Sequence, residues 1–128
     1  MDAEAKEELM FDFPQAEGLQ VLSQFKDVFL INASSYAVVI GVSKDDHPFE
    51  APSDGAIDRT CNYTGANLPK CHSEHKWKKL TTMECDKRTK LTIQLRHKTT
   101  GQIGYSTITD AVVRCDQPYL VTRFGNGT

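Results

Sequence analysis

The sequence contains no apolar run of membrane-spanning length. Its longest apolar stretch, residues 36–42, is only long enough for one β-strand, whereas a helix that crosses a bilayer needs about 20 apolar residues. The first ten residues, MDAEAKEELM, have neither the basic start nor the apolar segment of a signal peptide. These two absences predict an intracellular protein that has no membrane partner.

The usual catalytic patterns are also missing. The chain has no glycine-rich phosphate-binding loop, no serine nucleophile elbow and no helix-borne histidine pair of the metalloprotease type. Its acidic residues gather in the N-terminal tail and in loops, and they do not form a pair framed by apolar residues. We therefore expect a binding protein that has no enzymatic activity and no small-molecule substrate.

The spacing of the apolar residues predicts a single α+β domain. Between residues 15 and 31, apolar side chains recur every three or four residues, which predicts an amphipathic N-terminal helix. The segments that follow predict about four strands in a small antiparallel sheet. These predicted strands cover residues 35–42, 56–61, 90–96 and 103–108. Residues 1–13 are expected to form an acidic tail, residues 14–120 the domain, and residues 121–128 a C-terminal tail.

The charged residues are strongly segregated along the chain. The segment 59–98 carries ten Lys or Arg residues against three acids, a net charge of +7. Residues 1–58 carry three Lys residues against twelve acids, a net charge of −9. A basic segment of this kind is typical of proteins that bind nucleic acids.

The four cysteines allow two interpretations, which depend on the compartment. They are Cys61, Cys71, Cys85 and Cys115. In a secreted chain an even number of cysteines favours disulfides, and the Asn-X-Ser/Thr triplets at Asn32, Asn62 and Asn126 would accept glycans. In a reducing compartment the same cysteines are thiols or metal ligands. Because the chain begins without signal-peptide features, we favour the intracellular interpretation and keep the secreted, disulfide-bonded binding module as the alternative.

Spacing alone does not give a standard zinc site. Cys71, His72 and His75 lie close together, but Cys-His-x-x-His is not the spacing of a zinc finger, and the chain has no Cys-x-x-Cys pair. Buried thiols that pack as small apolar side chains are the simpler interpretation of the four cysteines.

The basic segment supplies a candidate DNA-binding surface. Lys90 and Arg96 fall at outward positions of a predicted strand, because they alternate with leucine and isoleucine. Together with lysines of the preceding loop they would neutralise several phosphates, and each contact adds about one unit to the salt dependence of binding. The predicted DNA-binding residues are Lys76, Lys78, Lys79, Lys87, Arg88, Lys90 and Arg96.

Four motifs occur in an order that resembles a known family. Residues 36–46 (YAVVIGVSKDD) look like a strand motif of the type GFALVIRRSKKD, and residues 59–65 (RTCNYTG) look like a strand that ends in a first cysteine. Residues 79–85 (KLTTMEC) are similar to a second-cysteine element, and residues 112–118 (VVRCDQP) stand where a terminal His-x-His-Pro falls. Over residues 14–120 the chain therefore resembles the DNA-binding domain of the far-red-impaired-response and Mutator-like transposase group, within the WRKY–GCM zinc-finger superfamily.

The resemblance implies a nuclear module of a transcription factor or transposase-derived protein, with double-stranded DNA as partner and one structural zinc ion. Cys61 and Cys85 match the family's two cysteine ligands, and Cys115 stands at the first histidine. Gln117 stands at the second histidine, so the fourth ligand has either been replaced by a nearby Cys or His, or the zinc site has been lost. The candidate metal ligands are Cys61, Cys85, Cys115, Cys71 and His75. A protein-interaction domain without metal or DNA binding is a further alternative.

Overall fold

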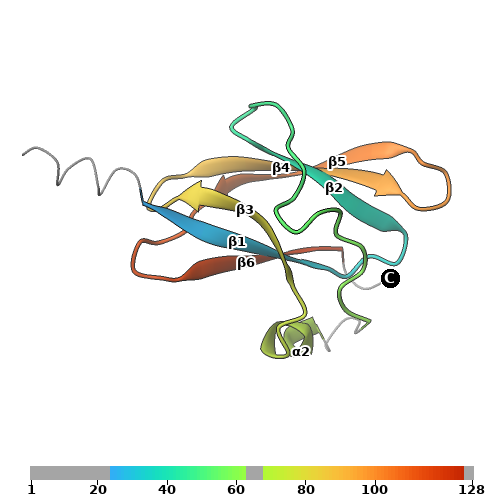
Figure 1. Ribbon diagram of the computed structural model, residues 1–128, viewed down its shortest axis with the longest axis horizontal. Helices are drawn as coiled ribbons and strands as arrows, with labels where there is room; N and C mark the ends of the chain where they lie inside the picture. Colours follow the sequence, from blue (N-terminus) through green and yellow to red (C-terminus); the bar gives the residue numbers. More distant parts are fainter. Residues whose placement is uncertain (1–23, 63–67, 126–128) are drawn as a thin grey trace, which may run out of the picture.

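The computed structural model describes residues 24–62 and 68–125, which form two small β-sheets (Figure 1). The elements are β1 (Phe25–Asn32), β2 (Ala37–Lys44), α2 (Leu68–Ser73), β3 (Lys78–Glu84), β4 (Thr89–His97), β5 (Ile103–Ala111) and β6 (Tyr119–Phe124). One three-stranded sheet has the order β3-β1-β6, and the other has the order β2-β4-β5. In the first sheet β1 pairs antiparallel with β3 and parallel with β6, whereas the second sheet is antiparallel throughout.

The predicted N-terminal helix is wrong where the structure describes it. Residues 25–31, the last part of that helix, belong to β1, and residues 15–23 lie outside the described residues. β1 is paired on both edges and packed on both faces, so its sequence lacks the alternation of a half-exposed strand. In residues 24–62 and 68–125, the six-residue α2 is the only helix. The protein is therefore mostly β with two sheets, and not the expected α+β fold of one helix and one antiparallel sheet.

Three of the four predicted strands are confirmed. Residues 35–42, 90–96 and 103–108 largely coincide with β2, β4 and β5, and β4 and β5 form the expected hairpin. In the fourth predicted segment only an isolated bridge occurs, between Val39 and Ile57. β3 begins with lysines, so its sequence is typical of a charged loop, and β6 extends beyond residue 120 into the segment expected to be a tail.

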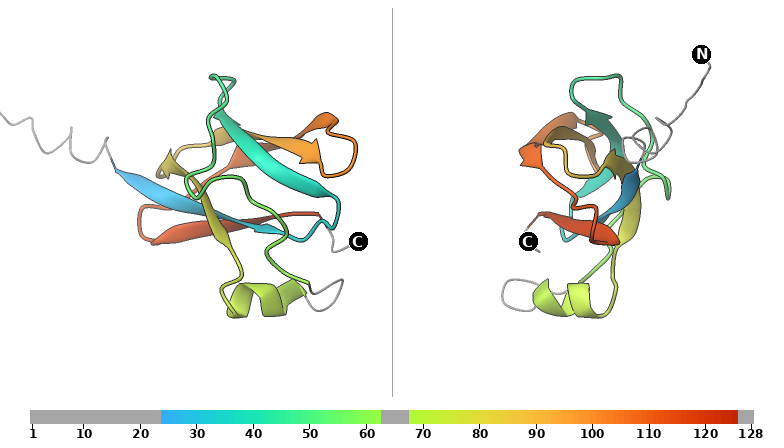
Figure 2. Two further views of the ribbon diagram at one scale, coloured as in Figure 1. Left: turned by 45° about the vertical axis from the view of Figure 1, so that its right-hand side comes forward. Right: turned by 90° about the vertical axis from the view of Figure 1, so that its left-hand side faces the viewer.

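The two sheets pack face to face around one apolar core, and Figure 2 shows them as two layers. Val28 and Leu30 of β1 share this core with Leu91 and Ile93 of β4, and all four side chains are buried. The predicted alternation of β4 is confirmed, since the intervening side chains are more exposed. Burial of a side chain of this size contributes about 1.5–3 kcal/mol, so the sandwich provides a rigid base for the loops.

A second, smaller apolar cluster attaches α2 to the β3-β1-β6 sheet, on the side away from β2, β4 and β5 (Figures 1 and 2). It consists of Ile31, Ala33, Cys61 and Cys71, with Trp77 and Val121 packed against them. The single helix of the described ranges, α2, has neither the length nor the apolar character needed to cross a membrane.

All four cysteines are paired in two disulfides. Cys61 is bonded to Cys71, with 5.9 Å between their Cα atoms, and Cys85 is bonded to Cys115, with 5.0 Å between theirs. The first disulfide joins the segment before α2 to α2 itself. The second joins the end of β3 to the segment that leads into β6. Each disulfide closes a loop of the chain and so restricts the unfolded state.

Candidate ligand-binding groove

The predicted zinc ligands do not come together as a metal site. Cys71 belongs to α2 and Cys61 is bonded to it, whereas Cys85 and Cys115 lie beyond the far end of β3. A disulfide sulfur is also not a thiolate, which is the form that binds zinc. Among the residues that the structure describes, no three His, Cys, Asp or Glu side chains are grouped closely enough to hold a metal ion.

The predicted DNA-binding residues are divided between the two sheets. Lys76, Lys78 and Lys79 lie at the start of β3, in the first sheet. The other four follow the opposite end of β3 or belong to β4, in the second sheet; they are Lys87, Arg88, Lys90 and Arg96. A seven-residue strand is about 20 Å long, so the first three lie apart from Lys87 and Lys90, which are themselves close together beside Asp45 and Asp46.

Several of these cations are paired with acids from the negatively charged N-terminal half. The Lys79 ammonium lies 3.2 Å from an Asp27 carboxylate oxygen, and the Lys90 ammonium lies 2.8 Å from Asp46. Lys87 lies 3.9 Å from Asp45. A phosphate that approached these lysines would meet the paired carboxylates as well.

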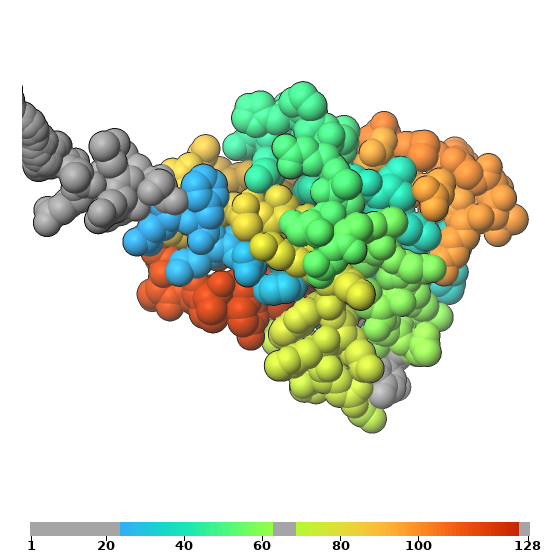
Figure 3. All heavy atoms as spheres, viewed as in Figure 1, coloured from blue at the N-terminus to red at the C-terminus, as the bar shows by residue number. Residues whose placement is uncertain are grey.

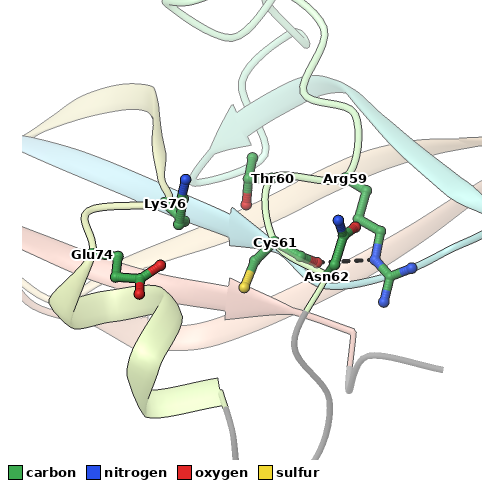
Figure 4. A pocket seen from close by; sticks show the side chains of 6 residues that line it. All are labelled: Arg59, Thr60, Cys61, Asn62, Glu74 and Lys76. Carbon is green, nitrogen blue, oxygen red and sulfur yellow. Dashed lines mark hydrogen bonds between the residues drawn. The ribbon is translucent and has the colours of Figure 1, made fainter.

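Two segments on either side of the Cys61–Cys71 disulfide form a groove. Residues 54–62 make one wall, and residues 74–78 make the other. The groove consists of two hollows of about 300 and 550 Å³, which share Arg59, Thr60 and Lys76. Figure 4 shows the smaller hollow, with Thr60 and Arg59 on one wall and Lys76 on the other, and Figure 3 shows the two segments side by side on one face.

The wall formed by residues 54–62 is fixed to the sandwich by hydrogen bonds. The Thr60 amide donates to the Asn32 carbonyl (2.9 Å), and the Asn32 amide donates to the Thr60 hydroxyl (3.0 Å). Further along, the Lys79 amide donates to the Asp54 carboxylate (2.8 Å), and the Asp54 amide donates to the Lys79 carbonyl (3.1 Å). This wall is therefore held by β1 and by β3.

The opposite wall is fixed by the turn that follows α2. His75 has a φ of 57°, in the left-handed region, and its amide donates to the His72 carbonyl (3.0 Å). The Lys76 amide donates to the carbonyl of Cys71, whose side chain is fully buried in the disulfide (2.8 Å). The turn directs the chain from α2 into β3, and it places His75 and Trp77 in the groove.

Trp77 is the centre of an aromatic cluster. The His75 ring stacks on it with 4.7 Å between ring centroids and 14° between the ring planes. His72 approaches edge-on at 5.0 Å, while Phe29 of β1 and Tyr119 of β6 lie 5.7 and 5.6 Å away. Contacts of this kind hold the indole in one orientation. The half-buried ring lines the larger hollow.

Asp58 of the groove is held by charged and polar partners, whereas Lys76 and Lys78 have no acidic partner among the described residues. The Asp58 carboxylate lies 2.6 Å from the Lys98 ammonium and accepts the Arg59 amide hydrogen (2.6 Å), and these two hydrogen bonds hold the pKa of Asp58 below its ordinary value. Lys76 and Lys78 are exposed, and neither forms an ion pair with an acid in the described ranges. The groove thus offers charged donors, acceptors and an aromatic surface to a polar ligand.

On the wall from Asp54 to Asn62, the sequence analysis singled out Cys61 as a candidate zinc ligand and residues 59–65 as a family motif, but it did not predict the groove or a role for residues 54–58. One signal was available on the other wall, because in HKWKK a tryptophan lies between a histidine and lysines, and Lys76 and Lys78 of that stretch were among the predicted DNA-binding residues. A disulfide between Cys61 and Cys71, which are ten residues apart, would have predicted that the two walls lie close together, but the sequence does not show that these two cysteines are paired.

Comparisons of the chain with protein-family models, with curated proteins and with solved structures found no match. The resemblance to the WRKY–GCM superfamily therefore stays a prediction.

Proposed function

We propose that the chain is a disulfide-stabilised binding module of an oxidising compartment, with the groove beside Trp77 as its ligand site. The observation that carries this proposal is the pairing of all four cysteines in two disulfides. Disulfides of this kind persist in secreted or otherwise oxidised proteins, whereas cytosolic and nuclear thiols are kept reduced. The alternative of a disulfide-bonded binding module is thus the interpretation that the geometry supports best.

The position of one disulfide links the redox state to the site. Cys61 lines the smaller hollow, and its partner Cys71 supports the turn that carries Lys76. The bond joins the two walls, so the groove keeps its shape without a ligand. A site that is already formed loses little conformational entropy on binding, which suits a binding module.

The distribution of charge also supports this function over that of a duplex-DNA surface. A protein that tracks a DNA backbone uses several cations on one face. Here Lys79, Lys87 and Lys90 lie beside acids, and Lys79 is near the opposite end of β3 from the other two.

The state of the cysteines tests the proposal directly. The protein is isolated from the cells that make it, with free thiols alkylated at lysis, and its intact mass is measured before and after reduction. We expect no alkylation before reduction, and a gain of four hydrogens from two disulfides on reduction. Four alkylated cysteines, or a zinc ion that is retained in the native mass spectrum, would overturn the proposal.

A further inference from the structure

We propose that the groove beside Trp77 binds an acidic carbohydrate, a sugar chain that carries carboxylate or sulfate groups. The inference rests on the proposed function, because it takes the groove as the ligand site and the disulfide-bonded form as the active form. It is carried by three features that meet in the larger hollow: a stacked aromatic pair, two exposed lysines without acidic partners in the described ranges, and two carboxylates that are held in place.

The aromatic pair provides a surface for a sugar ring. A pyranose has an apolar face of C–H bonds and a rim of hydroxyl groups, and the apolar face packs against aromatic rings. His75 and Trp77 lie 4.7 Å apart with nearly parallel planes, and both line the hollow. Phe29 and Tyr119 pack against the indole from the sheet. The surface is therefore in place before the ligand arrives, which lowers the entropic cost of binding.

The lysines supply the charge that the ligand has to match. Lys76 and Lys78 flank Trp77 in the sequence, line the same hollow and are exposed. In contrast to Lys79, Lys87 and Lys90, they have no acid at ion-pair distance within the part of the chain that the structure describes. Ammonium groups in this arrangement form charge-assisted hydrogen bonds to carboxylate or sulfate oxygens.

The carboxylates of the groove provide acceptors for the hydroxyl groups of a sugar. Asp54 and Asp58 line the hollow and are held by the Lys79 amide and by Lys98. Each has oxygen lone pairs that accept hydrogen bonds from sugar hydroxyls. Because these two carboxylates repel any negative group beside them, the acidic group of the sugar is expected at Lys76 and Lys78, and its neutral hydroxyl groups at Asp54 and Asp58. A nucleic acid has a phosphate at every nucleotide and fewer neutral hydroxyl groups to offer at these positions. The volume of about 550 Å³ lies within the range of roughly 300–1,000 Å³ that is typical of small-ligand sites.

Trp77 is the only tryptophan in the chain, so its fluorescence reports on the groove alone. The full-length protein, with its disulfides intact, is titrated with four probes: a uronic acid oligosaccharide, a sulfated oligosaccharide, a neutral oligosaccharide of the same length and a single-stranded oligonucleotide. We expect a fluorescence change with at least one acidic sugar, and at least about tenfold weaker binding of the neutral sugar. The acidic probe that binds more tightly identifies carboxylate or sulfate as the preferred group.

Two double variants locate the binding. Lys76→Ala with Lys78→Ala removes the two lysines of the groove, whereas Lys87→Ala with Lys90→Ala removes the same charge elsewhere. We expect the first variant to lose roughly tenfold or more in affinity for the acidic sugar, and the second to stay close to the wild-type protein. All four side chains are at the surface, so circular dichroism is expected to show the wild-type fold in both variants.

Three results would overturn the inference. They are the absence of binding to either acidic sugar, an equal loss of affinity in the two double variants, and tighter binding of the oligonucleotide than of both sugars. The intact mass of the same sample separates this failure from that of the proposed function. With two disulfides present, only the choice of ligand is wrong, whereas free thiols would contradict the module itself.

Discussion

At the scale of single residues, Asn32 connects β1 to the segments that lead into the groove. Its side chain is fully buried, and its amide nitrogen donates to the carbonyls of Ala37 (2.9 Å) and Ile57 (3.0 Å). Its side-chain oxygen accepts the Ser34 amide hydrogen (2.9 Å). A polar group is retained in an apolar interior when all its hydrogen bonds are made. Asn32 also begins a glycosylation triplet, but a buried, fully bonded amide is not accessible for glycan attachment.

We expect Asn32→Ala to destabilise the protein by about 2–3 kcal/mol. The substitution removes the acceptor of the Ser34 amide and the hydrogen bonds to the Ala37 and Ile57 carbonyls, of which the Ile57 carbonyl still accepts from the Val39 amide. Denaturant unfolding at constant temperature measures the effect. Asn62→Ala is the matched control, since Asn62 is exposed, and we expect its free energy of unfolding to change by no more than about 0.5 kcal/mol. An Asn32→Ala protein as stable as the control would contradict the role given to this side chain.

At the scale of elements, β1 and β4 show what the sequence determines and what it does not. β4 has one face toward the core and one toward solvent, so its alternation was enough to predict both the strand and its buried positions. β1 lies in the middle of its sheet and contacts α2 and the aromatic cluster on its outer face. Because both faces are covered, its spacing matched a helix equally well, and only the pairing with β3 and β6 decides between the two structures.

The contribution of each disulfide to stability can be measured separately by replacing both of its cysteines with alanine. Cys61 and Cys71 are ten residues apart, and Cys85 and Cys115 are thirty residues apart. Loop-closure entropy predicts a loss of stability of about 3 kcal/mol for C61A/C71A and about 4 kcal/mol for C85A/C115A. The midpoints of urea unfolding check the order of the two variants. Reduced wild-type protein is the control and is expected to be less stable than either variant, and variants as stable as the oxidised wild-type protein would contradict the expectation.

The two disulfides also differ in what they do for the groove. Only Cys61–Cys71 joins its walls, so C61A/C71A is expected to expose Trp77 to solvent and to shift its fluorescence to longer wavelength, while C85A/C115A keeps the wild-type spectrum under native conditions. The sequence contained the four cysteines but not their pairing, and the groove depends on that pairing.

At the scale of the whole molecule, folding places acids of residues 24–58 beside lysines of the basic segment, although the two groups are separate along the sequence. Each sheet combines strands of the acidic half with strands of the basic half, since β1 lies beside β3 and β2 lies beside β4. Asp27, Asp45 and Asp46 are thereby placed next to lysines of the basic segment. Each exposed ion pair contributes only about 0–1 kcal/mol to stability, but the three pairs place a carboxylate beside Lys79, Lys87 and Lys90. The net charge of each sequence segment does not show which acids lie beside which lysines, because these neighbours depend on the strand order.

The interleaving of charge has a consequence for duplex DNA. Release of the counterions condensed on DNA drives most non-specific binding of proteins to it. A lysine whose charge is already balanced by a neighbouring carboxylate neutralises a phosphate less effectively, so it releases fewer of these counterions. We therefore expect the affinity for a double-stranded oligonucleotide at low salt to be no higher than that of an acidic control protein. K87A/K90A is expected to leave this weak affinity unchanged, because both lysines lie beside acids.

An affinity that falls steeply with added salt and decreases in K87A/K90A would instead favour the DNA-binding function implied by the family resemblance. In that case the acids would be displaced from their lysines when DNA binds. Fluorescence anisotropy of a labelled duplex over a series of salt concentrations distinguishes the two outcomes.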